Sequence, residues 1–281
     1  MGSIYALVAL GYTMVYGIIK LLNFAHGDII MVGGYIALFS LTLGRMPPVL
    51  AALVTVAGCT LIAVIIEKLA YTPLRLAPRL SLLITAIGIS ILLQNLAQFF
   101  FTANDRPFPG QLLFPAGSVS LGGLSVTYTS IITIVLSIGS MAVLHFLVKY
   151  TKLGKAMRAV SEDQGAAQLM GINVNHIITF TFAVGAALAG VGALLYSVRF
   201  PLIFPTIGAM LGLKAFVAAV FGGIGSIAGT MVGGYAIGLL EALVTAAGLS
   251  RWVDGIVFAL LIIVLMVRPT GLMGRPIMEK V

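Results

Sequence analysis

Two ionisable side chains lie within strongly apolar stretches of the chain, Lys214 in residues 207–223 and Glu241 in residues 226–247. A charge at the centre of a membrane-spanning helix costs about 2.5–3.5 kcal/mol on insertion scales, so each residue is a candidate for a functional site. The two stretches are consecutive and would fold back on one another, which allows an ion pair. We keep two interpretations open: a polar site on a path through the membrane, and a buried pair that fixes the register of two helices.

A second polar cluster, Asn23, His26, Gly27 and Asp28, separates two apolar stretches near the start of the chain. One histidine and one carboxylate are too few ligands for a metal site, so we expect no metal. Asn23 or Asp28 could cap the following helix in a polar loop. Alternatively, the cluster marks a broken helix whose freed backbone groups line a translocation path. Helix termini at such a break would suit the carboxylate and the ammonium group of a zwitterion.

The elements that must position these residues are membrane spans. The chain has 281 residues, of which 60% are hydrophobic and 9% charged, whereas soluble domains carry about 25% charged residues. We predict an all-α integral membrane protein, a polytopic helical bundle of about eight or nine transmembrane segments with broken or re-entrant pieces, forming one membrane domain over residues 1–281. The candidate segments are roughly 2–20, 27–44, 47–66, 80–101, 127–148, 176–197, 207–223, 226–247 and 252–268.

Glycines recur within the apolar stretches, and Gly225, Gly229 and Gly233 are spaced four residues apart. This spacing predicts a flat helix face for close packing against a neighbour. The sequence from Gly223 to Ala228 formally matches a dinucleotide-binding fingerprint, but its membrane-length apolar flanks argue against a cofactor site. Residues 222–226 are interpreted as a tight turn or the bend of a re-entrant pair.

The net charge of +8 is spread over short connecting loops, which the positive-inside rule explains better than nucleic-acid binding. Most lysines and arginines fall on one side if the 67–79 loop, the 149–175 loop and the C-terminal tail are cytoplasmic. We therefore place the N-terminus outside and the C-terminus inside. The outer loop, about 102–126, is interpreted as either an ordered turn-rich cap or a disordered connector.

The 149–175 loop contains good helix formers, followed by a stop at Gly171 and possible caps at Asn173 and Asn175. We predict one or two short amphipathic helices on the cytoplasmic surface. They are interpreted either as surface helices anchored at lipid headgroups or as a coupling element that docks on a separate motor subunit. The candidate coupling residues are Lys155, Arg158, Glu162, Asp163, Ala166, Ala167 and Gly171.

The segment 165–172 resembles the cytoplasmic loop motif of ABC-importer permeases, in which an acidic residue precedes two alanines, three further residues and a glycine. Gly165 takes the acidic position here. The chain more broadly resembles the LIV-type branched-chain amino acid permease family, over almost its full length. The matching motifs are Gly11-Tyr12-Thr13-Met14-Val15-Tyr16-Gly17, Asn23-Phe24-Ala25-His26-Gly27-Asp28, Gly33-Gly34-Tyr35, Gly212-Leu213-Lys214-Ala215-Phe216, Gly222-Gly223-Ile224-Gly225-Ser226, Gly229-Thr230-Met231-Val232-Gly233-Gly234 and Glu241.

The resemblance implies a permease subunit of an ATP-driven importer in a bacterial or archaeal cell (inner) membrane. It implies a second related permease, two ATPase subunits and a periplasmic or lipid-anchored binding protein as partners. Substrates in the family are leucine, isoleucine and valine, and relatives in the same superfamily carry urea or short amides. The chain has no phosphate-binding loop of the Gly-x₄-Gly-Lys-Ser/Thr type, so we expect it to bind no cofactor and ATP and magnesium to bind partner subunits.

Two other classes of protein are weighed against this interpretation. An ion-coupled secondary transporter would carry its own midplane ion and substrate site and would need no motor. An integral membrane enzyme is disfavoured because the sequence lacks clustered intramembrane His, Asp and Glu. We therefore expect a transporter subunit and no enzymatic activity from this chain.

Overall fold

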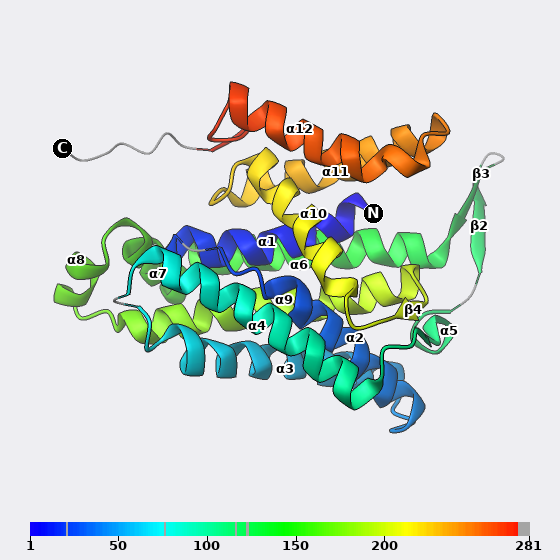
Figure 1. The fold of residues 1–281 in the computed structure, drawn as a ribbon, viewed down its shortest axis with the longest axis horizontal. Coiled ribbons are helices and arrows are strands. Elements are labelled where there is room, and N and C mark those ends of the chain that lie inside the picture. Colours follow the sequence, from blue (N-terminus) through cyan, green and yellow to red (C-terminus); the bar gives the residue numbers. More distant parts are fainter. Residues whose placement is uncertain (21, 76, 116, 122–123, 275–281) are drawn as a thin grey trace.

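A computed structural model of the protein describes residues 1–20, 22–75, 77–115, 117–121 and 124–274. The C-terminal segment 275–281, part of the tail that we predict to be cytoplasmic, lies outside the described residues. Long helices dominate the described chain, and short strands occur only in its connections (Figure 1).

Every predicted span corresponds to a helix. Among the described residues, seven helices are long and apolar enough to cross a membrane, when α3 is counted with the π-helical turn Glu67–Tyr71 and α12 with the 3₁₀ turn Ser250–Trp252; α2 and α10 are shorter apolar helices. The predicted fold class is therefore confirmed. The helices are α1 (Gly2–Ile19), α2 (His26–Thr42), α3 (Pro48–Ile66), α4 (Arg79–Phe101), α6 (Tyr128–Tyr150), α9 (Val174–Arg199), α10 (Ile207–Gly222), α11 (Ile227–Ala246) and α12 (Val253–Val267).

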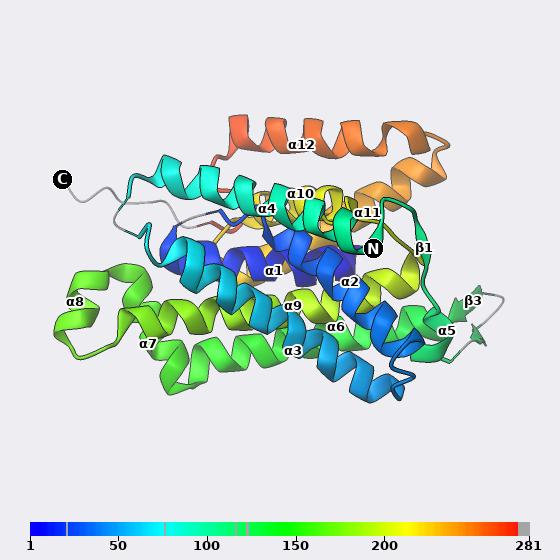
Figure 2. The same ribbon diagram turned by 60° about the horizontal axis from the view of Figure 1, so that its bottom comes forward.

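Helix α1 lies at the centre of the bundle and packs mainly against α9, α10 and α11. Figures 1 and 2 show the other helices arranged around it, with α12 and α4 toward the outside. Two short helices, α7 (Lys152–Glu162) and α8 (Gln164–Leu169), lie at one end of the bundle. The opposite end carries the N-terminus, the short helix α5 (Gly110–Leu113) and the strands (Figure 1).

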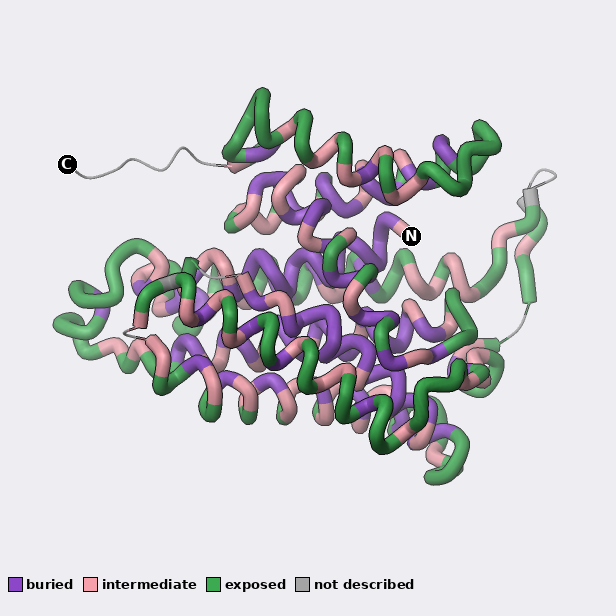
Figure 3. Tube along the Cα trace, in the orientation of Figure 1, coloured by how far each residue is buried: buried purple, intermediate pink, exposed green. Residues whose placement is uncertain are grey.

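The burial pattern explains this arrangement. Helix α1 is apolar on all sides, and all residues from Gly2 to Val15 are buried, as expected for a helix enclosed by others. Helices α3, α4, α6 and α12 are also strongly apolar, yet most of their residues are not buried (Figure 3). These apolar faces have no partner within the part of the chain that the structure describes, and they suit contact with lipid or with another membrane subunit.

Small residues let α11 approach two neighbours closely. A Cβ atom built at Gly234 or Gly238 would overlap the backbone of α1, at Ala6 and Gly2. A Cβ at Gly233 would overlap the carbonyl oxygen of Ala218 on α10. Helices in lipid associate through such close backbone packing, because lipid tails supply no hydrophobic drive between them.

The packing prediction is confirmed for Gly229 and Gly233 and wrong for Gly225. Gly229 packs against Gly222 across the α10–α11 contact. Gly225 precedes the first residue of α11, has φ +94° and lies in open space, so it belongs to the turn that reverses the chain. Ser226 then caps α11 by accepting a 3.2 Å hydrogen bond from the Gly229 backbone N–H. Residues 222–226 thus form a tight turn.

The connection between α4 and α6, about residues 102–126, is ordered over its described residues. Strand β1 (Arg106–Pro107) pairs antiparallel with β4 (Leu202–Ile203), which lies in the connection between α9 and α10. Strands β2 (Ser118–Leu121) and β3 (Leu124–Thr127) form an antiparallel hairpin that leads into α6. The interpretation as an ordered cap is therefore the correct one.

Candidate functional site

Each helix of the α7–α8 pair begins at a side-chain cap that the sequence analysis did not single out. The Thr151 hydroxyl caps α7 by accepting a 3.0 Å hydrogen bond from the Gly154 backbone N–H. The Asp163 carboxylate caps α8 by accepting one of 3.0 Å from the Ala166 backbone N–H. Two short helices in the 149–175 loop, as predicted, are therefore present.

The end of α8 is also as predicted. Gly171 adopts φ +82°, a left-handed conformation that glycine tolerates, and its backbone N–H donates to the Gln168 carbonyl. The Asn173 side chain then caps α9 by accepting a 3.1 Å hydrogen bond from the His176 backbone N–H. Asn175, the other predicted cap, lies inside α9 and accepts a hydrogen bond from Arg75 instead.

One face of α7 packs against the bundle, and the tip of α8 does not. Met157 and Val160 of α7 are buried, and α7 contacts α1, α6 and α9. By contrast, Leu169 and Met170 are 91% and 82% exposed. Among the predicted coupling residues, Ala167 is buried, whereas the exposed ones are Lys155, Arg158, Glu162, Asp163, Ala166 and Gly171. The pair is therefore anchored to the spans on one side and presents an open apolar tip on the other.

Lys214 and Glu241 form the predicted ion pair, within a larger group that we call the Lys214 cluster: Lys214, Glu241, Asp254 and Tyr5. Lys214 Nζ lies 2.8 Å from Glu241 Oε1 and 2.6 Å from Asp254 Oδ1. The Tyr5 hydroxyl donates a 3.1 Å hydrogen bond to Glu241 Oε1. The cluster thus joins α10, α11, α12 and α1 around one ammonium group and two carboxylates. Sequence analysis did not identify Asp254 or Tyr5, since the first lies at a helix start and the second resembles any aromatic residue of a span.

A second ionic group was not predicted, and we call it the Glu67 cluster: Glu67, Arg75, Thr72, Asn175 and Thr179. The Glu67 side chain is fully buried and pairs with the Arg75 guanidinium. The hydroxyl groups of Thr72 and Thr179 each donate a 2.8 Å hydrogen bond to its carboxylate. Arg75 also donates to Asn175 of α9. The cluster ties the π-helical turn and the segment after it to α9, near the end that carries α7 and α8.

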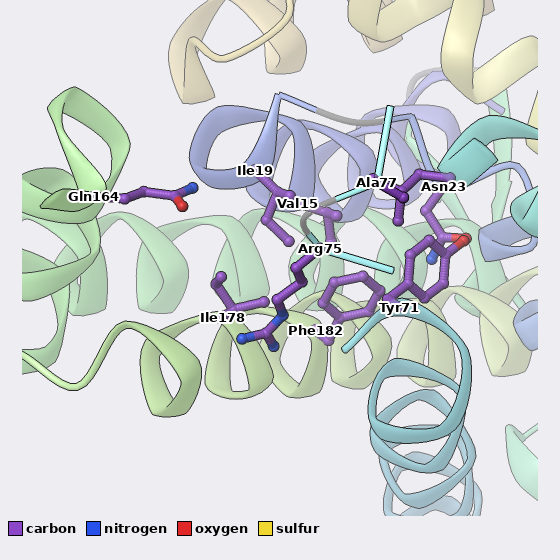
Figure 4. A pocket seen from close by; sticks show the side chains of 10 residues that line it. Val15, Ile19, Asn23, Tyr71, Arg75, Ala77, Gln164, Ile178 and Phe182 are labelled. Atoms are coloured by element: carbon purple, nitrogen blue, oxygen red, sulfur yellow. The ribbon is translucent and has the colours of Figure 1, made fainter. Parts of the chain in front are cut away.

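A cavity of about 260 Å³ opens beside the Glu67 cluster (Figure 4). Arg75 lines it, as does Tyr71, whose hydroxyl donates a 2.8 Å hydrogen bond to the Asn23 side chain. Gln164, the first residue of α8, extends toward the other labelled side chains. The rest of the lining is apolar and consists of Val15, Ile19, Ala77, Leu82, Ile178 and Phe182.

The polar cluster of residues 23–28 is divided between several locations. Only Asn23, in the link between α1 and α2, lines the cavity. His26 is buried against α1, with its ring edge-to-face to Tyr12 at 4.8 Å, and its Nε2 atom has no hydrogen-bond partner among the described residues. Gly27 packs closely against Gly208 of α10. The structure therefore does not gather these residues into one site.

Asp28 connects α2 to α4. Its carboxylate accepts hydrogen bonds from Ser90 and, at 3.0 Å, from the Gln94 amide. The prediction that Asn23 or Asp28 caps α2 is wrong, because the capping position is Ala25 and no side chain supplies a cap there. The interhelical acceptor role of Asp28 takes the place of capping, since Ser90 and Gln94 supply the donors that its buried carboxylate requires.

Comparison with known proteins identifies the kind of chain to which these features belong. Residues 1–266 match the model of a family described as branched-chain amino acid transport system / permease component. The chain is 43% identical to the high-affinity branched-chain amino acid transport system permease protein BraD of Pseudomonas aeruginosa, covering 100% of this chain and 94% of the relative. It is 42% identical to permease protein LivH of Salmonella typhimurium, with the same coverage. LivH of Escherichia coli K12 is 41% identical, again over 100% of this chain and 94% of the relative.

Proposed function

This chain belongs to the family of branched-chain amino acid transport permease components, and from that premise we propose that it is the membrane-spanning subunit of an ATP-driven importer. Its substrates would be leucine, isoleucine and valine, delivered by a periplasmic or lipid-anchored binding protein. It would act beside a second, related permease and above two ATPase subunits that bind ATP and magnesium. The membrane would be the bacterial or archaeal cell (inner) membrane.

The observation that carries the proposal is the α7–α8 pair. A motor subunit requires a docking element that is rigidly connected to the spans and whose surface is accessible to the motor. Met157 and Val160 supply the rigid connection, and exposed Leu169 and Met170 supply an apolar surface that an ATPase groove can cover. Movement of the motor would then shift α7–α8 and, through α1 and α9, rearrange the centre of the bundle.

The orientation follows from charge. The end that carries α7 and α8 also carries exposed Lys149, Lys152, Lys155 and Arg158. Basic residues are enriched in cytoplasmic loops. We therefore place the α7–α8 end in the cytoplasm and the α5 end, with its strands, on the side from which the binding protein delivers substrate. The C-terminus would be cytoplasmic, since α12 runs toward the α7–α8 end and Arg268 directly follows it (Figure 1).

The test is uptake into proteoliposomes that contain the complex co-purified with this chain and the binding protein. Labelled leucine, urea and a polar amino acid are compared with and without ATP. We expect leucine uptake that requires ATP. Uptake of urea alone would identify an amide importer of the same architecture, and uptake by the isolated chain driven by an ion gradient would identify a secondary transporter.

Docking is tested separately with the double variant Leu169→Ser, Met170→Ser. We expect it to lose co-purifying ATPase subunits while the thermal unfolding temperature of the chain is unchanged, since both side chains contact solvent. Leu43→Ser is the matched control, because Leu43 is 79% exposed and lies in the connection after α2, outside the α7–α8 pair. Equal ATPase recovery from the double variant and the control would contradict the proposed docking surface.

A further inference from the structure

The cavity between α1, the π-helical turn, α8 and α9 has a lining divided by chemistry. Apolar walls come from α1, α4 and α9, with Leu82, Ile178 and Phe182 each buried. Polar groups are concentrated on Asn23, Tyr71, Arg75 and Gln164. Small-molecule sites in proteins have this composition, mostly apolar with a few polar groups that fix orientation.

The size of the cavity bounds its occupant. At about 260 Å³ it exceeds the ~150 Å³ apolar cavity that holds one benzene molecule. It is far too small for a peptide. A compact molecule with a short aliphatic group and a small polar head therefore fits the available space.

The net charge of the residues beside the cavity restricts the charge that a ligand can carry. Arg75 is the charged residue of the lining that the structure describes, and its pair with buried Glu67 has no net charge. A net anion or a net cation would enter this region without a compensating charge, at a high desolvation cost. A zwitterion has no net charge, and its two ends need only hydrogen-bond donors and acceptors.

Such partners are available. Arg75 Nε is buried and has no hydrogen-bond partner among the described residues, although both other guanidinium nitrogens are engaged. It is a charge-assisted donor suited to a carboxylate. The Gln164 side-chain oxygen is an acceptor of the kind that an ammonium group requires, and the Asn23 oxygen, which already accepts from Tyr71, has a second lone pair.

We propose that this cavity binds a zwitterionic aliphatic amino acid from the α7–α8 side, with its carboxylate toward Arg75 and its side chain against Leu82, Ile178 and Phe182. The assignment of that side to the cytoplasm, and of the amino acid to the class that is transported, rests on the proposed function. A ligand here touches α8 through Gln164 and α9 through Ile178 and Phe182. Its presence therefore bridges the coupling element and the spans, which makes the site a sensor of amino acid already delivered.

The experiment uses the complex of this chain with its partner subunits in lipid nanodiscs, without binding protein. The probe is a leucine whose side chain carries a diazirine, photolysed in place and located by mass spectrometry. We expect labelled peptides from the cavity lining, protected by excess leucine and not by urea or glutamate. Labelling spread over the exposed face of α12, or displaced equally by a fatty acid, would show non-specific apolar binding and overturn the proposal.

Two variants sharpen the result. Leu82→Trp fills the cavity and should lower cavity labelling by about ten-fold or more, which corresponds to about 1.4 kcal/mol of lost binding. Leu80→Trp, two residues away on the same helix and 67% exposed, is the matched control and should label as the wild type does. If Leu82→Trp does not fold, Gln164→Leu tests the site instead. Gln164 is exposed, so its substitution should leave the fold intact, and loss of its polar group should still weaken labelling. Unchanged labelling in the folded variants would refute the site.

The same preparations are assayed for ATP-driven leucine uptake after binding protein is added. Suppose that the wild type takes up leucine but the cavity variants are labelled to the same extent as the wild type. That result would overturn only the cavity site. Absence of leucine uptake in the wild type would overturn the proposed function, while the labelling would still show independently whether the cavity binds leucine.

Discussion

The two ionic clusters of the chain differ in how completely their charges are enclosed. In the Glu67 cluster the acid is fully buried and accepts from Arg75 and two threonine hydroxyls. In the Lys214 cluster one ammonium group is shared by two acids, and the side chain of Asp254 is 48% exposed. The first cluster is therefore closed around its carboxylate, whereas the second has an excess negative charge that remains partly accessible.

We therefore call the Glu67 cluster a clamp, meaning a group that holds two elements together, and the Lys214 cluster an exchangeable site, meaning a group that can lose one ionic contact and keep another. The Glu67 cluster holds the π-helical turn against α9 and so keeps one wall of the cavity in place. The Lys214 cluster can lose its Asp254 contact and keep the pair between Lys214 and Glu241. We expect substitutions in the first to act mainly on stability, and substitutions in the second to act on uptake at a smaller cost in stability.

The largest effect is expected for Glu67→Ala. It leaves the Arg75 charge partly buried without its carboxylate, and breaking one side of a buried pair costs about 3–5 kcal/mol. The free energy of unfolding in a denaturing-detergent titration measures it, with the exposed Glu162→Ala as control. A loss no greater than that of the control would mean that the Glu67 cluster is not a clamp.

Lys214→Met should be less destabilising. Glu241 keeps its hydrogen bond from Tyr5, and half-exposed Asp254 regains solvent, so about 1–3 kcal/mol is expected. Leucine uptake should fall more than expression does if the cluster lies on the translocation path. The double variant Lys214→Met, Glu241→Gln removes both charges. Full recovery of leucine uptake in this double variant would mean that Lys214 only fixes the register of α10 against α11 and has no role on the translocation path.

Single hydrogen-bond deletions compare the clusters directly. Thr179→Val and Tyr5→Phe each remove one donor to a carboxylate. Interhelical hydrogen bonds in membrane proteins average about 0.6 kcal/mol, with a maximum of about 1.7 kcal/mol. We expect Thr179→Val to lie near the upper value, because Glu67 is fully enclosed, and Tyr5→Phe near the average. The reverse order in unfolding titrations would contradict the distinction between clamp and exchangeable site.

The smallest change in stability is expected for Asp254→Asn. A half-exposed ion pair contributes about 0–1 kcal/mol, and Lys214 retains Glu241. The informative measurement is leucine uptake relative to the amount of folded complex. A clear decrease with unchanged unfolding temperature would place Asp254 on the path, and unchanged uptake would remove it.

The sequence predicted the spans well because each is a long apolar run bounded by charged or turn-forming residues. It also predicted the pairing of Lys214 with Glu241, since an ionisable residue is conspicuous within such a run. The pairing of Glu67 with Arg75 was missed because both residues lie at a span end, among other charges, where exposure to water is the ordinary expectation. The π-helical turn that buries Glu67 has no signature in residue spacing.

Gly225 shows the limit of spacing arguments. A repeat of four residues is identical inside a helix and in the turn that precedes it, so only the position of the cap at Ser226 separates Gly225 from Gly229. The cavity could not be predicted either. Its lining comes from α1, the π-helical turn, α4, α8 and α9 and from two of the segments that connect them, and no local pattern specifies how these parts meet.

The central position of α1 has a consequence for how the protein is made. Thr13 hydrogen-bonds to Thr230 across 217 residues of sequence, and Tyr5 to Glu241 across 236. Helix α1 is thus synthesised well before α11, which supplies the partner in both hydrogen bonds. A nascent chain that stops before α11 leaves both hydroxyl groups without these partners. During synthesis α1 therefore lacks these two partners until α11, in the final third of the sequence, has been made.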